Sequence, residues 1–239
     1  MSQGFSFTLD GAEIQAEQGM TIMEAADKAG VWIPRLCWLK DISPGGACRL
    51  CTVVVNGRHQ AACTQPASPG IEVVNDSAEL FAMRKQLVEM LLVEGNHYCM
   101  FCEKSGNCEL QAVAYRFGIT HPRYPYSFPE RAVDATHPEV LIDHNRCIRC
   151  GRCVRTSSET DAKGVFGFVQ RGAHTALAVD ASEGLGATVL EGLDAAVKAC
   201  PVGAILRKRE GYAVPVGERL YDNEPIGSDV EQRRTTPAE

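Results

Sequence analysis

The sequence lacks both a long apolar run and a long basic run. Its 239 residues are 45% hydrophobic, yet no stretch approaches the roughly 18 apolar residues that a membrane span requires. The formal net charge is −6, and lysine and arginine form no long run of the kind that binds nucleic acid. The first residues also lack the basic and apolar regions of a secretion signal. We therefore expect a globular, cytoplasmic protein with no membrane span and no nucleic-acid partner.

Signatures of common catalytic sites are missing as well. The sequence contains neither a P-loop nor a nucleophile elbow. Gly184-Leu185-Gly186 superficially resembles the start of a dinucleotide-binding fingerprint, but Val189 occupies the position of the third glycine. We therefore expect no nicotinamide site on this chain.

Cysteine, in contrast, is abundant, with eleven residues. The number is odd, and in a reducing cytoplasm thiols are more often metal ligands than disulfide partners. The cysteines fall into three groups, and the middle group has only three thiols, so His97 is the nearest candidate for its fourth ligand. The resulting sets are Cys37, Cys48, Cys51 and Cys63; His97, Cys99, Cys102 and Cys108; and Cys147, Cys150, Cys153 and Cys200. No cysteine remains for a nickel–iron centre, so we expect the chain to conduct electrons without oxidising a substrate itself.

Turn and capping patterns predict a small β-rich domain around the first set. Apolar residues alternate on both sides of Asp10-Gly11, which predicts a β-hairpin. Thr21 and Glu24 form a capping-box pattern, and the short helix that follows is expected to end at a C-cap, Gly30. The β-branched residues 52–55 predict a strand that ends in an Asn-Gly turn, so the chain should reverse there.

This reversal is expected to bring Cys63 back towards Cys51. Gly45 and Gly46, just before Cys48, let the backbone approach an inorganic cluster and offer amide groups to its sulfur atoms. The pattern favours a two-iron cluster. The alternative is a zinc knuckle formed by Cys48 and Cys51 with two distant thiols.

The segment 46–51, Gly-Ala-Cys-Arg-Leu-Cys, resembles the core of the β-grasp [2Fe–2S] ferredoxins. Plant-type ferredoxins separate their first two ligands by four residues, whereas ten residues separate Cys37 from Cys48. The longer spacing is similar to that of the iron–sulfur subunit of the respiratory NADH dehydrogenase.

A long helix is expected to lead to the second set. Asp76 and Glu79 mark its start, and apolar residues recur at helical spacing until Gly95. The dense ligands that follow favour a cuboidal cluster. The respiratory subunit has a similar segment, in which one histidine and three cysteines bind [4Fe–4S], but it has three residues where Tyr98 alone separates His97 from the first cysteine here. On the alternative reading, His97 only satisfies a local backbone carbonyl.

The third set has the arrangement of bacterial ferredoxins. A strand is expected at 140–142, and a Cys-x-x-Cys-x-x-Cys loop follows, whose fourth ligand, Cys200, precedes Pro201. Positions that would hold a second cluster carry Leu190, Leu193, Ala196 and Ser157 instead. The resemblance therefore implies a single [4Fe–4S] cluster. Arg146, Arg149, Arg152 and Arg155 either balance its charge or form a solvated face.

The order of the three sets over residues 5 to 206 resembles the N-terminal part of the large iron–sulfur subunit of the respiratory NADH dehydrogenase. A short, separate version is typical of the diaphorase small subunits of soluble NAD-reducing [NiFe]-hydrogenases. The resemblance implies an α+β protein with one [2Fe–2S] and two [4Fe–4S] clusters. It implies a β-grasp [2Fe–2S] domain at 1–76, a small helical domain with one histidine and three cysteines at 77–136, a bacterial-ferredoxin-like [4Fe–4S] domain at 137–210 and a tail at 211–239.

The same resemblance implies a function. The chain is expected to be the electron-transfer subunit of a cytoplasmic NAD-reducing hydrogenase, with partners that are an FMN/NAD-binding diaphorase subunit and the small and large [NiFe]-hydrogenase subunits. FMN and NAD(H) are expected on the partner alone. The alternatives are the electron-transfer subunit of another NAD-linked complex, such as a formate dehydrogenase, a bifurcating hydrogenase or an NADH dehydrogenase, and a zinc-bound structural scaffold.

Overall fold

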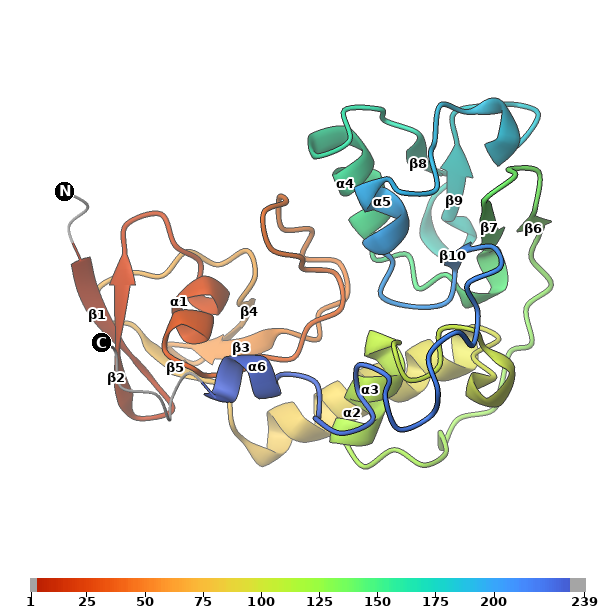
Figure 1. The fold of residues 1–239 in the computed structure, drawn as a ribbon. Coiled ribbons are helices and arrows are strands. Elements are labelled where there is room, and N and C mark those ends of the chain that lie inside the picture. The colour runs from red at the N-terminus through yellow and green to blue at the C-terminus, as the bar shows by residue number, and fades with distance from the viewer. Residues whose placement is uncertain (1–3, 233–239) are drawn as a thin grey trace.

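The computed structural model describes residues 4–232. Within that range helices combine with three separate β-sheets, which confirms the expected α+β class. Figure 1 shows the largest sheet at one end of the molecule and the two smaller sheets at the other, with two helices along one side between them. No helix of this part of the chain is both long and apolar enough to cross a membrane.

The largest sheet has five strands in the order β2-β1-β5-β3-β4. The elements of this part are β1 (Gly4–Leu9), β2 (Ala12–Glu17), α1 (Ile22–Lys28), β3 (Thr52–Val55), β4 (Arg58–Ala61) and β5 (Glu72–Val74). The hairpin of β1 and β2 confirms the prediction from Asp10-Gly11, and β1 also pairs with β5 in parallel. A parallel pair needs a crossover, and α1 lies on that crossover with its buried side chains in the core of the sheet.

The capping box of α1 is present as predicted. The Thr21 side chain accepts a hydrogen bond from the Glu24 amide, and the Glu24 carboxylate accepts one from the Thr21 amide at 2.8 Å. The C-cap is Ala29, one residue earlier than expected. Gly30 follows with a φ of 71°, so the glycine serves the left-handed turn after the cap instead of the cap itself.

Two helices form the middle part: α2 (Ala78–Glu94) and α3 (Glu109–Arg116), with a short 3-10 turn, η1 (Cys99–Phe101), between them. The cap of α2 is Ser77, whose hydroxyl accepts from the Leu80 amide at 3.2 Å. The prediction that Asp76 starts the helix was therefore wrong by one position, since serine is as good a cap as aspartate. The helix ends at Gly95, as expected.

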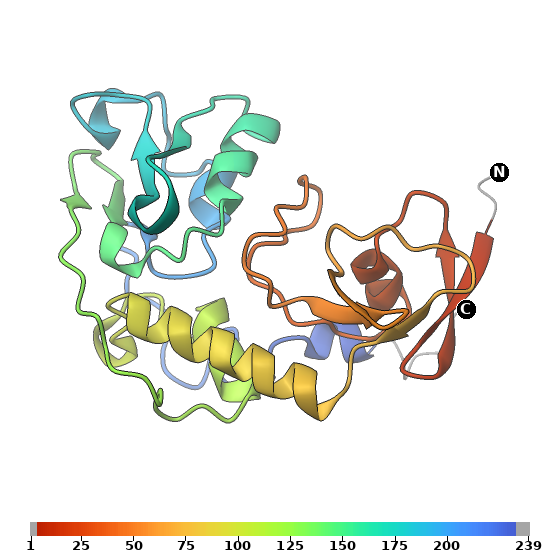
Figure 2. The ribbon, with the colours of Figure 1, turned by 180° about the vertical axis from the view of Figure 1, so that it is seen from behind.

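The third part contains a three-stranded and a two-stranded sheet with short helices (Figure 2). Its elements are β6 (Val133–Asp134), β7 (Val140–Asp143), η2 (His144–Arg146), α4 (Arg152–Glu159), β8 (Phe166–Val169), η3 (Gly172–His174), β9 (Ala176–Val179), η4 (Leu185–Ala187), α5 (Ala195–Lys198) and β10 (Ile205–Arg207). The strand expected at 140–142 is confirmed as β7, which pairs with β10 and β6. The β8–β9 hairpin was not predicted.

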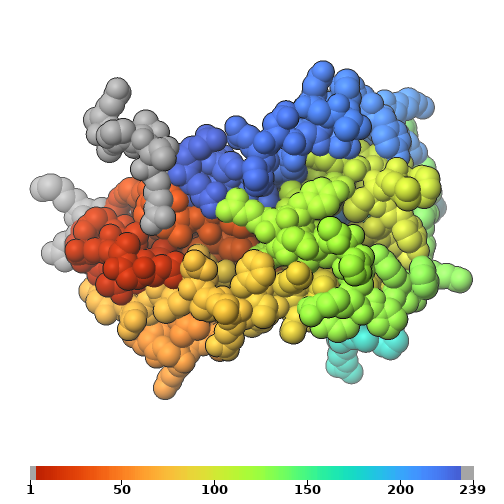
Figure 3. Space-filling model, turned by 90° about the horizontal axis from the view of Figure 1, so that it is seen from below, coloured from red at the N-terminus to blue at the C-terminus, as the bar shows by residue number. Residues whose placement is uncertain are grey.

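After β10 the chain returns along α3 to the first sheet, where it forms α6 (Ser228–Glu231). Figure 3 shows this C-terminal segment lying against both the N-terminal and the middle parts. A Cβ on Gly227 would lie 2.5 Å from the Trp32 ring, and the Arg116 guanidinium lies 4.8 Å from the centre of the same ring. Residues 211–232 of the expected tail thus pack on their own chain, and residues 233–239 lie outside the described part.

Arg84 of α2 fastens the middle part to the first. Its guanidinium is buried and donates to the Thr52 carbonyl at 2.8 Å and to the Asn75 carbonyl at 3.0 Å.

We expect Arg84→Met to lower the free energy of unfolding by about 3 kcal/mol, because buried carbonyls lose their donors. The measurement is urea unfolding followed by circular dichroism. Gln86→Met, on the exposed side of the same helix, should leave the midpoint unchanged; equal midpoints for both variants would contradict the prediction.

Candidate iron–sulfur centres

All eleven cysteines have free thiols in the structure. Among residues 4–232, no three histidine, cysteine or acidic side chains meet as they do around one metal ion. The ligands of an iron–sulfur cluster bind different iron atoms, so they surround a larger volume than the ligands of a single ion.

The first set converges in the way that the sequence predicts. The Sγ atoms of Cys51 and Cys63 lie 3.4 Å apart, and the Cys48 amide donates to the Cys37 Sγ at 3.5 Å. Hydrogen bonds from the thiols of Cys48 and Cys63 lower the pKa of Cys37 to about 2. The same contact with Cys37 raises the pKa of Cys48 and of Cys63. All four sulfur atoms therefore belong to one interacting group.

The backbone of the first loop faces the sulfurs. The amides of Ala47 and Cys48 both stabilise the Cys37 thiolate, which favours its charged form. Gly46 has a φ of 60°, and a Cβ there would press on the Thr64 side chain at 3.2 Å. The loop can therefore curl as tightly as the sequence suggested, because a glycine stands at the position that requires it.

Burial, together with the charges of Cys102 and Cys99, raises the pKa of the Cys108 thiol to about 12. The three thiols of the middle set therefore lie near one another. The Cys102 Sγ leaves no room for a side chain at Gly203, where a Cβ would lie 2.6 Å away. The close packing brings this loop against the segment that follows Cys200.

His97 is half-buried, and its backbone carbonyl lies 3.8 Å from the Cys99 Sγ. Its Nε2 has no hydrogen-bond partner, and burial lowers the pKa of the imidazole to about 4. A neutral ring with a free lone pair is the form of histidine that binds metal. The Nε2 faces Gly95, where a Cβ would lie 2.7 Å away. The unpartnered nitrogen fits a ligand better than a side chain that caps a carbonyl, and the ligand role stays a prediction.

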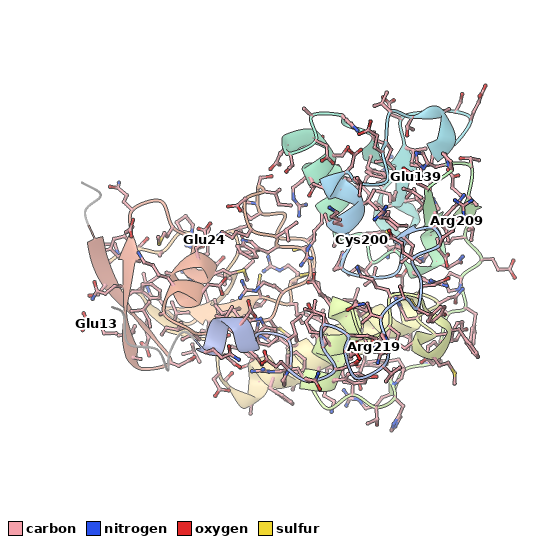
Figure 4. The ribbon with its side chains drawn as sticks, viewed as in Figure 1. Glu13, Glu24, Glu139, Cys200, Arg209 and Arg219 are labelled. Atoms are coloured by element: carbon pink, nitrogen blue, oxygen red, sulfur yellow. The ribbon has the colours of Figure 1, made fainter. Side chains whose placement is uncertain are left out.

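The third set surrounds one cavity. Cys147, Cys150, Cys153 and Cys200 all line it, together with apolar side chains that include Val202 and Ile205. Figure 4 shows Cys200 directly after α5, on the side of the third part that faces the rest of the chain. Burial raises the pKa of Cys150 to about 12 and raises that of Cys153. Such buried thiols are unfavourable as free anions, and a shared cationic centre in this cavity would stabilise them.

The four arginines of the third loop are not a solvated face. Arg152 is only 2% exposed, and its guanidinium binds Glu109 through two hydrogen bonds of 2.5 and 2.7 Å. Arg146 donates to the Cys102 Sγ at 3.6 Å and to Glu103 at 2.8 Å. These pairs join the third loop to the middle one.

Two of these partners were not singled out from the sequence. Glu103 and Glu109 each directly follow a cysteine of the middle set, and that position was the available signal. Arg84 was also missed; it lies close enough for the Cys51 charge to act on it, although burial dominates and lowers its pKa to about 10. An arginine on an otherwise apolar helix face gave no separate signal in the sequence.

Three family models match the chain in succession. Residues 2–78 match a 2Fe-2S iron-sulfur cluster binding domain, and residues 84–123 match the iron-sulfur binding region of NADH-ubiquinone oxidoreductase G. Residues 137–206 match the ferredoxin-like domain of NADH-quinone oxidoreductase subunit 3. The three matches have the same order as the three ligand sets.

Individual relatives agree with these models. The chain is 43% identical to the gamma subunit of the NAD-reducing hydrogenase HoxS of Cupriavidus necator, over 92% of this chain and 94% of that subunit. It is 35% identical to the alpha subunit of an NADPH-Fe(3+) oxidoreductase of Geobacter sulfurreducens, of which it spans only 24%. A crystal structure of an NAD+-reducing [NiFe]-hydrogenase in the H2-reduced state contains a chain that superposes with a TM-score of 0.92, at 44% identity, over 96% of this chain and 98% of that one. The chain therefore belongs to the family of iron–sulfur subunits that includes the gamma subunit of the NAD-reducing hydrogenase HoxS.

Proposed function

We propose that the chain is the electron-transfer subunit of a cytoplasmic NAD-reducing hydrogenase, in which it relays electrons between a [NiFe]-hydrogenase module and an FMN/NAD(H) module. The observation that carries this proposal is the match to HoxS gamma along nearly the whole of both chains. Eleven thiols that must stay reduced to bind iron suit the cytoplasm.

The ligand sets give the proposal its chemistry. We assign [2Fe–2S] to the first set, [4Fe–4S] with His97 as the fourth ligand to the middle set, and [4Fe–4S] to the third set. Bound clusters of these types accept and release single electrons. The mixed sheet crossed by α1, with a core of its own, supports a β-grasp domain at 1–76. We further propose a helical domain at 77–136, supported by α2 and α3, a ferredoxin-like domain at 137–210, supported by the two smaller sheets, and a C-terminal segment at 211–239.

The chain itself is proposed to be non-catalytic. Its eleven cysteines are all assigned to the three sets, so the nickel–iron centre would belong to the small and large hydrogenase subunits. FMN and NAD(H) would belong to the diaphorase partner. The residues of this chain would hold the clusters, exclude water from them and fix the distances between them.

Contacts between the loops support an order of transfer. The third loop touches the first loop through Arg155, which donates to the Cys37 carbonyl at 2.6 Å. It touches the middle loop through the ion pair of Arg152 with Glu109. These two contacts support a path in which the third set lies between the other two, and we infer that electrons pass through it.

Metal analysis of the anaerobically purified chain tests the cluster assignment. We expect about ten iron atoms per chain, as two plus four plus four, with matching acid-labile sulfide. About three zinc ions without sulfide would instead support the structural scaffold. Nickel in the purified complex would separate a hydrogenase from a formate dehydrogenase.

Substitution of His97 tests the least regular ligand. His97→Cys should keep the middle cluster and lower its reduction potential, because a thiolate adds negative charge where imidazole is neutral. His97→Ala should change the electron paramagnetic resonance spectrum of the middle cluster alone. His121→Ala, at an exposed position, is the control. A middle cluster with the same spectrum and potential in all variants would remove His97 from the ligand set.

A further inference from the structure

One guanidinium joins the backbones of two candidate cluster loops. Arg155, on α4, donates from Nη2 to the Cys37 carbonyl at 2.6 Å and from Nη1 to the Cys150 carbonyl at 3.5 Å. Cys37 belongs to the first set and Cys150 to the third. Figure 1 shows the loop between α1 and β3 reaching from the first part of the molecule towards α4.

The two loops make room for this side chain by carrying glycine. A Cβ on Gly45 would lie 2.5 Å from the Arg155 Nη1, and a Cβ on Gly151 would lie 2.9 Å from the same atom. A second contact holds the same loop to α4, since the Ser43 hydroxyl and the Ser43 amide both donate to the Glu159 carboxylate, the amide at 2.7 Å. The guanidinium therefore sits where side chains on either loop would exclude it.

Among the described residues, no carboxylate forms a direct ion pair with Arg155, although Glu159, one helical turn further along α4, is near enough to interact with its charge. Arg146, Arg149 and Arg152 each form an ion pair of 3.0 Å or less with an acidic side chain. Within residues 4–232, Arg155 forms no such pair; its terminal nitrogens donate to carbonyl oxygens, and its buried Nε has no partner. A positive charge without a directly bonded carboxylate thus lies between the first and third sets.

Such a charge acts on electron transfer. Reduction adds an electron to a cluster, so a nearby cation favours the reduced form and raises the reduction potential. The interaction is strong where water is excluded, and it falls with distance. The charge of Arg155 should therefore raise the reduction potentials at the first and third sets, and that at the middle set much less.

We propose that Arg155 is a positioning residue that fastens the first cluster loop to the third and raises the reduction potentials of both clusters together. This inference rests on the ligand assignment proposed above. It concerns a residue that binds no iron itself and acts through its charge and its two carbonyl contacts.

Redox titration of the whole purified complex, followed by electron paramagnetic resonance, tests the inference. In Arg155→Gln, the ratio of reduced to oxidised cluster at a fixed potential should fall about tenfold for both the first and the third cluster, a shift of ~59 mV each. The middle cluster should shift by much less. Arg155→Lys keeps the charge and should keep most of both potentials. Arg171→Gln removes a charge from an exposed position of the same part and should shift neither cluster.

Unchanged potentials of either the first or the third cluster in Arg155→Gln would overturn the inference, and so would equal shifts of all three clusters. If that variant fails to assemble, Gly45→Ala provides a second test, because it keeps the arginine but displaces its guanidinium. This variant should lower the reduction potentials of both the first and the third cluster. Ser43→Ala weakens the loop contact without changing any charge, and it should leave both potentials in place. Absence of iron from the unmodified complex would refute the ligand assignment instead, so the two failures are distinguishable.

Discussion

Burying an ionised thiol away from water costs free energy unless hydrogen-bond donors or opposite charges stabilise it. Much of this molecule is arranged to supply such groups. Backbone amides face the sulfur atoms in the cysteine loops, as the amides of Ala47 and Cys48 face the Cys37 sulfur. Arginines stand at the junctions between the loops. The carboxylates that neutralise them come from a neighbouring loop in the case of Glu109 and Arg152, so that the same ion pairs that balance charge also hold the loops together.

Because these ion pairs both balance charge and hold the loops together, arginines are frequent in the third loop. An exposed ion pair contributes little to stability, but Arg152 is almost fully buried, and loss of one partner would leave the other charge uncompensated. The pair of Arg152 with Glu109 also fixes the relative orientation of the two loops, because a planar guanidinium binds a carboxylate through two parallel hydrogen bonds. Lysine at this position would keep the charge and lose the orientation.

Local features of the fold were predictable because their signals lie within a few residues of one another. The Asp10-Gly11 hairpin and the Thr21 capping box depend on neighbours in the chain, and both are present. The cap of α2 was misplaced by one residue because Asp76 and Ser77 are both good caps, and the choice depends on the tertiary position of the helix. The grouping of the cysteines followed from spacing and from the resemblance. The contact of Arg155 with Cys37 was not predictable, since it joins positions 118 residues apart through a loop without regular structure.

The C-terminal segment has a consequence for how the chain reaches its final form. Gly227 packs against Trp32 near the opposite end of the sequence, so this contact closes nearly the whole chain into a ring. Closure over so many residues is slow compared with the formation of a hairpin or a helix. The first sheet can therefore form early during synthesis, while its Trp32 face becomes covered only after Gly227 has left the ribosome.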